Sequence, residues 1–218
     1  MPAIRFTDGN PLPVANIFCI GRNFAAHAAE LNNPLEPEPL VFIKPTSAIL
    51  QEGQAIVLPA WSTDIHHECE LVLAIGKGGN DISADAALDH VAGYGLGLDL
   101  TARDLQTQAK QKGLPWALSK GFPGSACLSQ FLPASKLVAP SASQFSLKVN
   151  GVQRQQGDCQ LMLHTLPHII AYLSSRFGLQ SGDLVFTGTP AGVAALHSGD
   201  VLELSLNEGQ LVARFSVA

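Results

Sequence analysis

The sequence predicts an α+β fold that is dominated by β-strands. Short apolar runs recur between glycine, proline, asparagine and aspartate residues, a pattern typical of folds built from many short strands. Only three segments have the character of helices, and they do not alternate regularly with the strands, which disfavours a doubly wound parallel sheet. The predicted strands span residues 17–20, 70–75, 94–98, 145–149, 184–187, 201–206 and 211–217.

Two turns are predicted to close hairpins. Asn150-Gly151 stands between valines at positions 149 and 152, and Asn-Gly readily adopts the positive φ angles of a type I′ turn. The tripeptide Asn207-Glu-Gly209 lies between two predicted strands in the same way and is expected to close a second hairpin.

The three predicted helices have recognisable ends. Residues 23–31 begin with Asn23 as a candidate N-cap. Residues 101–112 carry Thr101 and Asp104 in the spacing of a capping box and stop before a glycine. Residues 165–177 have Pro167 in the first turn and a glycine just past the end, the usual asymmetry of helix termini.

Length and composition indicate a single globular domain over residues 1–218. The chain is 46% apolar and 14% charged, which favours a compact buried core over disorder. A net charge of −5 provides no basic surface for nucleic acid or an anionic membrane. The apolar runs are too short to span a bilayer, and no secretory signal is visible at the amino terminus, so we expect a cytoplasmic protein.

The four cysteines do not form a recognisable site. Cys19, Cys69, Cys127 and Cys159 are widely spaced, and no C-x-x-C pair that would indicate a metal or redox site is present. We expect them to be small residues of the core, although a catalytic thiol stays an alternative.

Glu68 and Glu70 form the most informative pair in the chain. If their segment is a strand, side chains two residues apart share a face, so both carboxylates project together. At about 4 Å and an effective dielectric near 20, two such charges repel by roughly 4 kcal/mol, and a cation would relieve that repulsion. An all-oxygen cluster suits Mg²⁺, Mn²⁺ or Ca²⁺. A zinc-protease motif is excluded because its second histidine would stand at Leu71. A solvated strand edge is the alternative.

Asp99 supplies a third candidate carboxylate. In the run from Gly93 to Asp99, strand alternation places the three glycines on the same face as the aspartate, which leaves room for another element or a ligand. The glycine spacing does not match a dinucleotide-binding fingerprint. Arg103 and Gln106 follow, three residues apart on one helix face, where both can lean over a ligand near Asp99. Pairing of Arg103 with a surface carboxylate is the alternative.

Taken together, these motifs resemble the fumarylacetoacetate hydrolase family, and most closely its short single-domain acylpyruvate hydrolase branch. The resemblance covers about residues 14–218, in the family's order. The segments that carry it are G-R-N-F-x-x-H-x-x-E (21–30), F-I-K-P-T-S (42–47), H-H-E-C-E-L (66–71), G-Y-G-L-G-L-D-L-T-A-R-D-L-Q (93–106), K-G-L-P-W-x-L-x-K-G-F (112–122) and F-T-G-T-P-A-G-V (186–193).

The resemblance implies a β-sandwich roll with a few helices, usually a homodimer, that holds Mg²⁺ or Mn²⁺, with Ca²⁺ as a possible substitute. It also assigns roles to ten residues. The metal ligands would be Glu68, Glu70 and Asp99; the catalytic residues His27, Glu30 and Lys120; and the substrate-binding residues Arg103, Gln106 and Thr189, with Arg22 as a further candidate for a substrate carboxylate.

The physical character of these residues agrees with the implied roles. His27 and Glu30 stand three apart on a helix, so the carboxylate can orient the imidazole, although such a pair is also common on surfaces. The Gly188-Thr-Pro-Ala-Gly192 segment lacks the lysine of a phosphate loop and is expected to form a tight turn that presents the Thr189 hydroxyl or N–H to a carboxylate, an ordinary β-turn being the alternative.

The expected reaction is hydrolysis of a carbon–carbon bond in an acylpyruvate such as fumarylpyruvate or acetylpyruvate, with His27 activating water and Lys120 stabilising the expelled pyruvate enolate. The same site chemistry serves decarboxylation of oxaloacetate and isomerisation or decarboxylation of dienoates, which are the alternatives. A non-catalytic binding module would predict loss of one ligand or of the His27–Glu30 pair, and all five residues are present.

Overall fold

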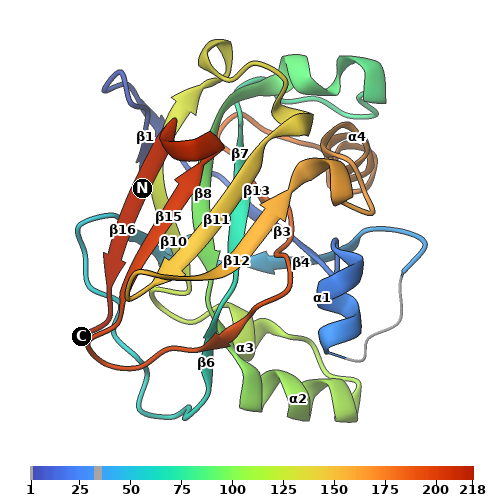
Figure 1. Cartoon of the computed structure of the whole chain (residues 1–218). Coiled ribbons are helices and arrows are strands. Elements are labelled where there is room, and N and C mark those ends of the chain that lie inside the picture. Colours follow the sequence, from blue (N-terminus) through green and yellow to red (C-terminus); the bar gives the residue numbers. More distant parts are fainter. Residues whose placement is uncertain (1, 32–35) are drawn as a thin grey trace.

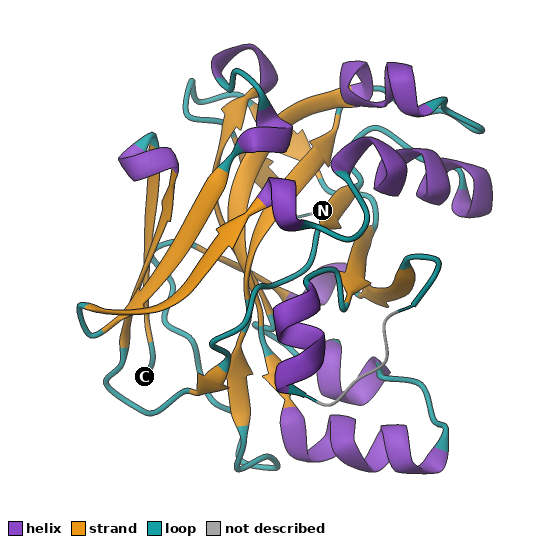
Figure 2. Ribbon diagram, turned by 45° about the vertical axis from the view of Figure 1, so that its right-hand side comes forward, coloured by secondary structure: helices purple, strands orange, loops and turns teal. Residues whose placement is uncertain are grey.

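Two β-sheets face each other across the main hydrophobic core of the computed structural model, which describes residues 2–31 and 36–218 (Figure 1). The strands make up most of the regular structure, and the longer helices lie along one side of the sheets (Figure 2). This arrangement confirms the predicted α+β class with a majority of strands.

The larger sheet has seven strands and contains the segments that carry the predicted carboxylates. In spatial order its strands are β4 (Leu40–Lys44), β3 (Ile17–Gly21), β13 (Leu184–Phe186), β7 (Cys69–Ile75), β8 (Val91–Asp99), β10 (Ala126–Pro133) and β5 (Ile49–Gln51). The pairs β3–β13 and β10–β5 are parallel, and the remaining pairs are antiparallel.

The smaller sheet is antiparallel and follows the alternation expected of a sheet with one solvated face. Phe145, Leu147 and Val149 point into the core, as do Leu202 and Leu204, whereas the residues between them are more exposed. The strands in spatial order are β12 (Val152–Asp158), β11 (Gln144–Val149), β15 (Val201–Leu206) and β16 (Leu211–Ser216). Its inner face packs on one side of the larger sheet to form the sandwich.

Two small sheets, four α-helices and several short 3₁₀ segments complete the described structure. The sheets pair β1 (Ala3–Arg5) with β2 (Pro11–Pro13), and β14 (Ala194–Ala195) with β6 (Ile65–His67) and β9 (Thr101–Ala102). The helices are α1 (Ala25–Glu30), α2 (Arg103–Lys112), α3 (Ala117–Lys120) and α4 (Leu166–Phe177). Figure 1 shows α1, α2 and α3 at the end of the molecule near β6, away from α4. None of these described helices has the length and apolar character to cross a bilayer.

The predicted strands and hairpins are confirmed with small differences in their ends. Asn150 and Gly151 join β11 to β12 with φ angles of 52° and 79°, which are the positive values of the predicted turn. The second hairpin joins β15 to β16 through Asn207–Gly209, a tight turn in which all three residues have positive φ.

Two of the three predicted helix starts are wrong. α1 begins at Ala25, and Asn23 instead donates through its side-chain amide to the carbonyls of His164 and Thr187, so it anchors the chain to distant segments. α2 begins at Arg103, because Thr101 is part of β9 and gives its hydroxyl to the Asp99 carbonyl. The third start is correct, since Thr165 caps α4 by accepting from the His168 N–H.

The glycine face of β8 is filled by aromatic rings. A Cβ atom on Gly95 would lie 2.9 Å from the Phe131 ring, and one on Gly97 would lie 2.6 Å from Phe186. Of the two expected occupants, another element and a ligand, the structure therefore shows the first. Because these glycines have no side chain, β8 can pack closely against the aromatic rings. Asp99 is the last residue of this strand.

Candidate metal centre and active-site pocket

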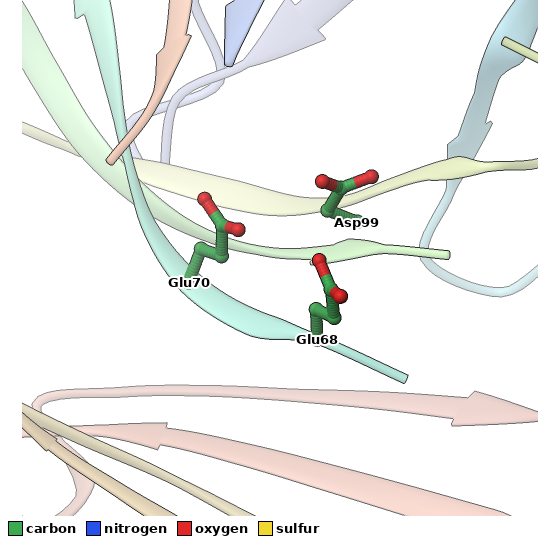
Figure 3. A group of neighbouring side chains, drawn as sticks. All are labelled: Glu68, Glu70 and Asp99. Atoms are coloured by element: carbon green, nitrogen blue, oxygen red, sulfur yellow. The ribbon is translucent and has the colours of Figure 1, made fainter. Parts of the chain in front are cut away.

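Three carboxylates converge where β7 and β8 lie side by side. Glu68 immediately precedes β7, Glu70 is its second residue and Asp99 ends β8. The backbone pairing sets this arrangement, because Glu70 lies opposite Gly97 and the Asp99 N–H donates to the Glu68 carbonyl at 2.9 Å. One oxygen from each side chain lies within 4.8 Å of the other two, and all three residues are buried. Figure 3 shows the carboxylates on the same side of the two strands.

Basic side chains surround two of these three carboxylates. The Lys120 ammonium donates to Glu68 Oε2 and to Asp99 Oδ2, both at 2.6 Å. Arg103 Nη2 lies 2.5 Å from Glu68 Oε1, and Lys44 Nζ lies 2.7 Å from Asp99 Oδ1. Glu68 and Asp99 are therefore each neutralised from two directions.

These contacts keep the groups charged in spite of their burial. Burial alone would raise the pKa of Glu68, but Lys120 and then Arg103 outweigh it and hold the pKa well below its usual value. Burial lowers the pKa of Lys120, yet Asp99 and Glu68 more than reverse this, and the net pKa is raised. An ammonium between two carboxylates is thus the stable state.

Glu70 differs from its two neighbours in lacking such a partner. In residues 2–31 and 36–218 no basic side chain lies within 4.0 Å of its carboxylate, whose Oε2 accepts the Gly188 N–H at 2.7 Å. Burial, followed by the charges of Asp99 and Glu68, raises the pKa of Glu70 well above its usual value. A divalent cation beside Glu70 would supply the missing positive charge, and the three carboxylates offer it the oxygen ligands that Mg²⁺ and Mn²⁺ prefer. The residues present therefore fit a divalent metal.

The carboxylates form the floor of a pocket with about 400 Å³ of empty space, part of it open to solvent. Nearly all the site residues predicted from the sequence line this pocket. Glu30 is not among the lining residues, but it contacts His27, which is. The lining residues are Ile20, Gly21, Arg22, His27, Leu31, Phe42, Glu68, Glu70, Asp99, Arg103, Gln106, Lys110, Trp116, Lys120 and Thr189.

His27 and Glu30 are in contact at the wall of this pocket. His27 Nδ1 lies 3.2 Å from Glu30 Oε2 on the successive turns of α1, as their spacing predicts. The Gly192 N–H donates to the Glu30 carboxylate at 3.1 Å, which ties α1 to the turn at 188–192. With Nδ1 bound to the carboxylate, Nε2 is the nitrogen of His27 that can exchange a proton with a molecule in the pocket.

The predicted substrate-binding arginines have different surroundings. Arg103 Nη1 donates to Gln106 Oε1 at 2.6 Å, so the two share a helix face as expected. Arg103 also pairs with the buried Glu68, which decides against the alternative of a surface partner. Arg22 pairs with Glu36 at 2.6 Å and has a φ of 58°, a conformation unusual for a residue other than glycine. Such strain is common at ligand-binding positions.

Thr189 lies in the pocket lining, but its hydroxyl is engaged within the protein. It donates to the Cys69 carbonyl at 2.8 Å and accepts from Gln155 Nε2 at 2.8 Å. The hydroxyl hydrogen is therefore directed at the Cys69 backbone in this structure, and a role for Thr189 in substrate binding stays a prediction. Of the two donors considered, the backbone N–H remains the candidate.

Two buried residues of the site were not singled out from the sequence. Lys44 stands in the F-I-K-P-T-S segment, but nothing in that segment indicates that its side chain reaches Asp99. Gln155 belongs to a polar strand whose other residues give no sign that one amide is buried. Gln155 is found from the burial pattern of β12, and Lys44 from its contact with Asp99 in the folded chain.

The cysteines have the character of core residues. All four are buried, and burial raises the pKa of each thiol, that of Cys159 to about 12. A thiol with a raised pKa is a poor nucleophile at neutral pH, so the environment of these residues does not favour thiol catalysis.

Comparison with known proteins places these observations in a family. The model of the fumarylacetoacetate (FAA) hydrolase C-terminal domain matches residues 16–216. The chain is 44% identical to the mitochondrial oxaloacetate tautomerase of Rattus norvegicus, over 93% of this chain and 91% of that protein. It is also 44% identical to the mitochondrial oxaloacetate decarboxylase of Dictyostelium discoideum, over 87% of this chain and 88% of that protein.

A solved structure agrees in both fold and sequence. The fumarylpyruvate hydrolase of Pseudomonas aeruginosa, solved in complex with Mn²⁺ and pyruvate, superposes with a TM-score of 0.94 at 38% identity. The match covers 100% of this chain and 95% of that one. On the strength of the matched domain, the fold and the acidic triad, this chain belongs to the fumarylacetoacetate hydrolase family.

Proposed function

We propose that this protein is a divalent-metal-dependent enzyme that acts on oxaloacetate, interconverting its keto and enol forms and releasing CO₂ to give pyruvate. The observation that carries the proposal is the buried Lys120 ammonium, held by Glu68 and Asp99 at the floor of a pocket that His27 also lines. Relatives at 44% identity that are named oxaloacetate tautomerase and oxaloacetate decarboxylase support this substrate over an acylpyruvate.

Both reactions develop negative charge on the oxygen of a 2-oxo group. Glu68, Glu70 and Asp99 would hold a divalent cation, which would act as a Lewis acid toward this group. Lys120 has three N–H donors, of which the two carboxylates take two, and the third can donate to the developing enolate oxygen. Arg103, which already contacts Gln106, is placed to bind a substrate carboxylate at the same wall of the pocket.

Tautomerisation requires one proton to leave carbon 3 of oxaloacetate and one to reach the oxygen on carbon 2. His27 is the candidate base, since Glu30 engages Nδ1 and leaves Nε2 to accept the proton. The electron pair of the broken C–H bond becomes the double bond between carbons 2 and 3, and the π pair of the 2-oxo group moves onto its oxygen. The Glu30 carboxylate stabilises the imidazolium that forms until it gives its proton to that oxygen, which completes the enol.

Decarboxylation uses the same charge stabilisation without a base. The bond from carbon 3 to the distal carboxylate breaks, CO₂ leaves, and the electron pair remains on pyruvate enolate. Lys120 offsets this charge until the enolate takes up a proton and leaves as pyruvate.

Hydrolysis of acylpyruvates is the second candidate, and the His27–Glu30 contact favours it. His27 Nε2 would take a proton from water, the resulting hydroxide would attack the distal carbonyl, and the carbon–carbon bond would break to release pyruvate enolate and a carboxylic acid. The similar fumarylpyruvate hydrolase structure with bound pyruvate supports this reading.

A substrate panel separates the two candidates. We expect the protein to accelerate enol-to-ketone conversion and pyruvate release from oxaloacetate, with a smaller kcat/KM for acetylpyruvate and fumarylpyruvate. Addition of chelator should abolish each activity, and Mg²⁺ or Mn²⁺ should restore it. A kcat/KM that is higher for an acylpyruvate than for oxaloacetate would establish the hydrolase instead.

Magnesium as the resident ion, a homodimeric assembly and a single catalytic domain over residues 1–218 remain part of the proposal. The predicted location in the cytoplasm also stays a prediction, beside relatives that are named mitochondrial. Metal analysis and light scattering of the purified protein test the first two directly.

A further inference from the structure

Gln155 is a buried amide in an edge strand whose neighbouring positions are exposed. It lies on β12, where residues 152–154 and Gln156 are exposed, and its own exposure is only 1%. Its side chain points inward from the smaller sheet toward the pocket of the larger one. A buried polar group at such a position must have its hydrogen-bonding capacity satisfied by specific partners.

The amide makes all four hydrogen bonds of which it is capable. Oε1 accepts from the Cys69 N–H at 3.0 Å and from His67 Nδ1 at 2.9 Å. Nε2 donates to the Thr189 hydroxyl at 2.8 Å and to the Pro190 carbonyl at 2.9 Å. The Cys69 donor and the Pro190 acceptor together determine which end of the amide is oxygen, so His67 carries its proton on Nδ1.

These bonds join two segments that hold different parts of the site. On one side are His67 and Cys69, which flank Glu68, and Cys69 directly precedes Glu70. On the other is the turn at 188–192, whose Gly188 N–H donates to Glu70 Oε2 at 2.7 Å and whose Gly192 N–H donates to Glu30 at 3.1 Å. The same turn therefore contacts a candidate metal ligand and the carboxylate that orients His27.

The turn also lies directly against the backbone of β12. A Cβ atom on Gly192 would lie 2.0 Å from the Arg154 carbonyl oxygen, and the φ of this glycine is 100°. This close approach brings the turn within reach of Gln155 and leaves no space for the turn to shift toward the strand. Gln155 contributes two hydrogen bonds that hold the turn in place, beside the bond from the Thr189 hydroxyl to the Cys69 carbonyl.

We propose that Gln155 is a positioning residue that locks the 188–192 turn onto the strand carrying Glu70, and so sets the orientation of both Glu70 and the His27–Glu30 pair. It touches neither substrate nor metal in this role. Its effect passes through the Gly188 and Gly192 N–H groups, and groups that orient metal ligands in this way commonly change metal affinity or activity when they are removed.

The test compares two substitutions on the same strand. Gln155→Leu removes all four hydrogen bonds at nearly constant volume. Gln153→Leu makes the same change at an exposed position whose side chain donates a hydrogen bond to Gln156, and it is the matched control. Mn²⁺ affinity is measured by electron paramagnetic resonance of the free ion, and kcat and KM are measured for oxaloacetate at a temperature where both variants are folded.

We expect Gln155→Leu to weaken Mn²⁺ binding and to lower kcat, each by about 10- to 100-fold, with a smaller change in KM. Gln153→Leu should match the wild type in both measurements. A purely structural role predicts that Gln155→Leu lowers Tm while the folded protein keeps the wild-type Mn²⁺ affinity and kcat, and this result would overturn the proposal.

A second variant keeps the test decisive if Gln155→Leu does not fold. Gln155→Asn retains a polar amide but shortens it by one methylene, so that it cannot bridge both segments, and the same two readouts apply. Only the measurements of kcat and KM depend on the proposed function. If the wild type does not act on oxaloacetate, the proposed function fails, whereas the Mn²⁺ comparison still supports or overturns the role of Gln155.

Discussion

Glu30 contacts His27 through a distance of 3.2 Å between Oε2 and Nδ1, and the Gly192 N–H holds the same carboxylate from the other side. A six-residue helix is too short to be stable alone, so contacts of this kind keep α1 at the pocket. The pair is thereby presented as an oriented base beside the carboxylate cluster, and the roles of its members can be tested separately.

His27→Asn removes the candidate base while preserving its contact with Glu30, because the Asn amide nitrogen can replace Nδ1. Enol–keto conversion and any acylpyruvate hydrolysis should fall by about 100- to 10,000-fold. Decarboxylation of oxaloacetate, which needs no base, should survive. Steady-state assays of the three reactions check this, with His197→Asn as control since that side chain is 79% exposed. Equal loss of all three activities would show that His27 does not act as the base.

Glu70→Gln should abolish specific Mn²⁺ binding but leave the fold intact. Burial and the neighbouring Asp99 and Glu68 charges raise the pKa of Glu70, so the ionised side chain is unfavourable without a cation. We therefore expect the metal-free variant to be at least as stable as the metal-free wild type. Thermal unfolding with and without Mn²⁺ tests both statements.

In that experiment the wild type should gain about 2.7 kcal/mol when the free ion is at 100 times its dissociation constant. The Glu70→Gln variant should gain nothing, and Glu208→Gln, at the β15–β16 turn, should behave as the wild type. Full stabilisation of Glu70→Gln by Mn²⁺ would remove Glu70 from the ligand set.

Lys120→Met should lower turnover of oxaloacetate by about 100- to 1,000-fold, since the variant loses the charge that offsets the enolate. It should also destabilise the metal-free protein by roughly 3–5 kcal/mol, because Glu68 and Asp99 each lose a buried partner. Kinetics and denaturant unfolding measure the two effects, with Lys112→Met on the exposed end of α2 as control. Wild-type kcat in folded Lys120→Met would contradict its catalytic role.

Lys44→Met tests a buried residue that contacts Asp99 from outside the pocket. Its ammonium pairs with Asp99 and donates to the carbonyls of Leu100 and Lys120, and it does not line the pocket. We expect a loss of stability of about 3–5 kcal/mol and weaker Mn²⁺ binding, with KM for oxaloacetate little changed. The exposed Lys136→Met variant is the control, and a Lys44→Met protein as stable as the wild type would show that the pair is dispensable.

The convergence of the three carboxylates was the feature of the site that the sequence predicted most directly. Glu68 and Glu70 share a face because side chains alternate along a strand, and Asp99 joins them because β7 and β8 are antiparallel neighbours in the register that places Glu70 opposite Gly97. The His27–Glu30 and Arg103–Gln106 contacts are local spacings on helices, and they too could be anticipated.

Contacts between distant segments could not be anticipated in this way. Lys44 reaches Asp99 only because α3 and β4 pack together at the edge of the larger sheet, and Gln155 reaches Thr189 from the other sheet. Asn23 has the residue type of a helix cap, yet its amide bonds to Thr187 and His164 across more than a hundred residues of sequence. Tertiary contacts of this kind override local preference.

The most direct measurement is the anomalous diffraction of crystals grown with Mn²⁺. The account predicts one strong peak beside the pocket, within about 2.0–2.3 Å of an oxygen from each of Glu68, Glu70 and Asp99. A peak at another place in the molecule would contradict the proposed metal centre. So would an ion that does not contact Asp99, whose carboxylate would then pair only with Lys44 and Lys120.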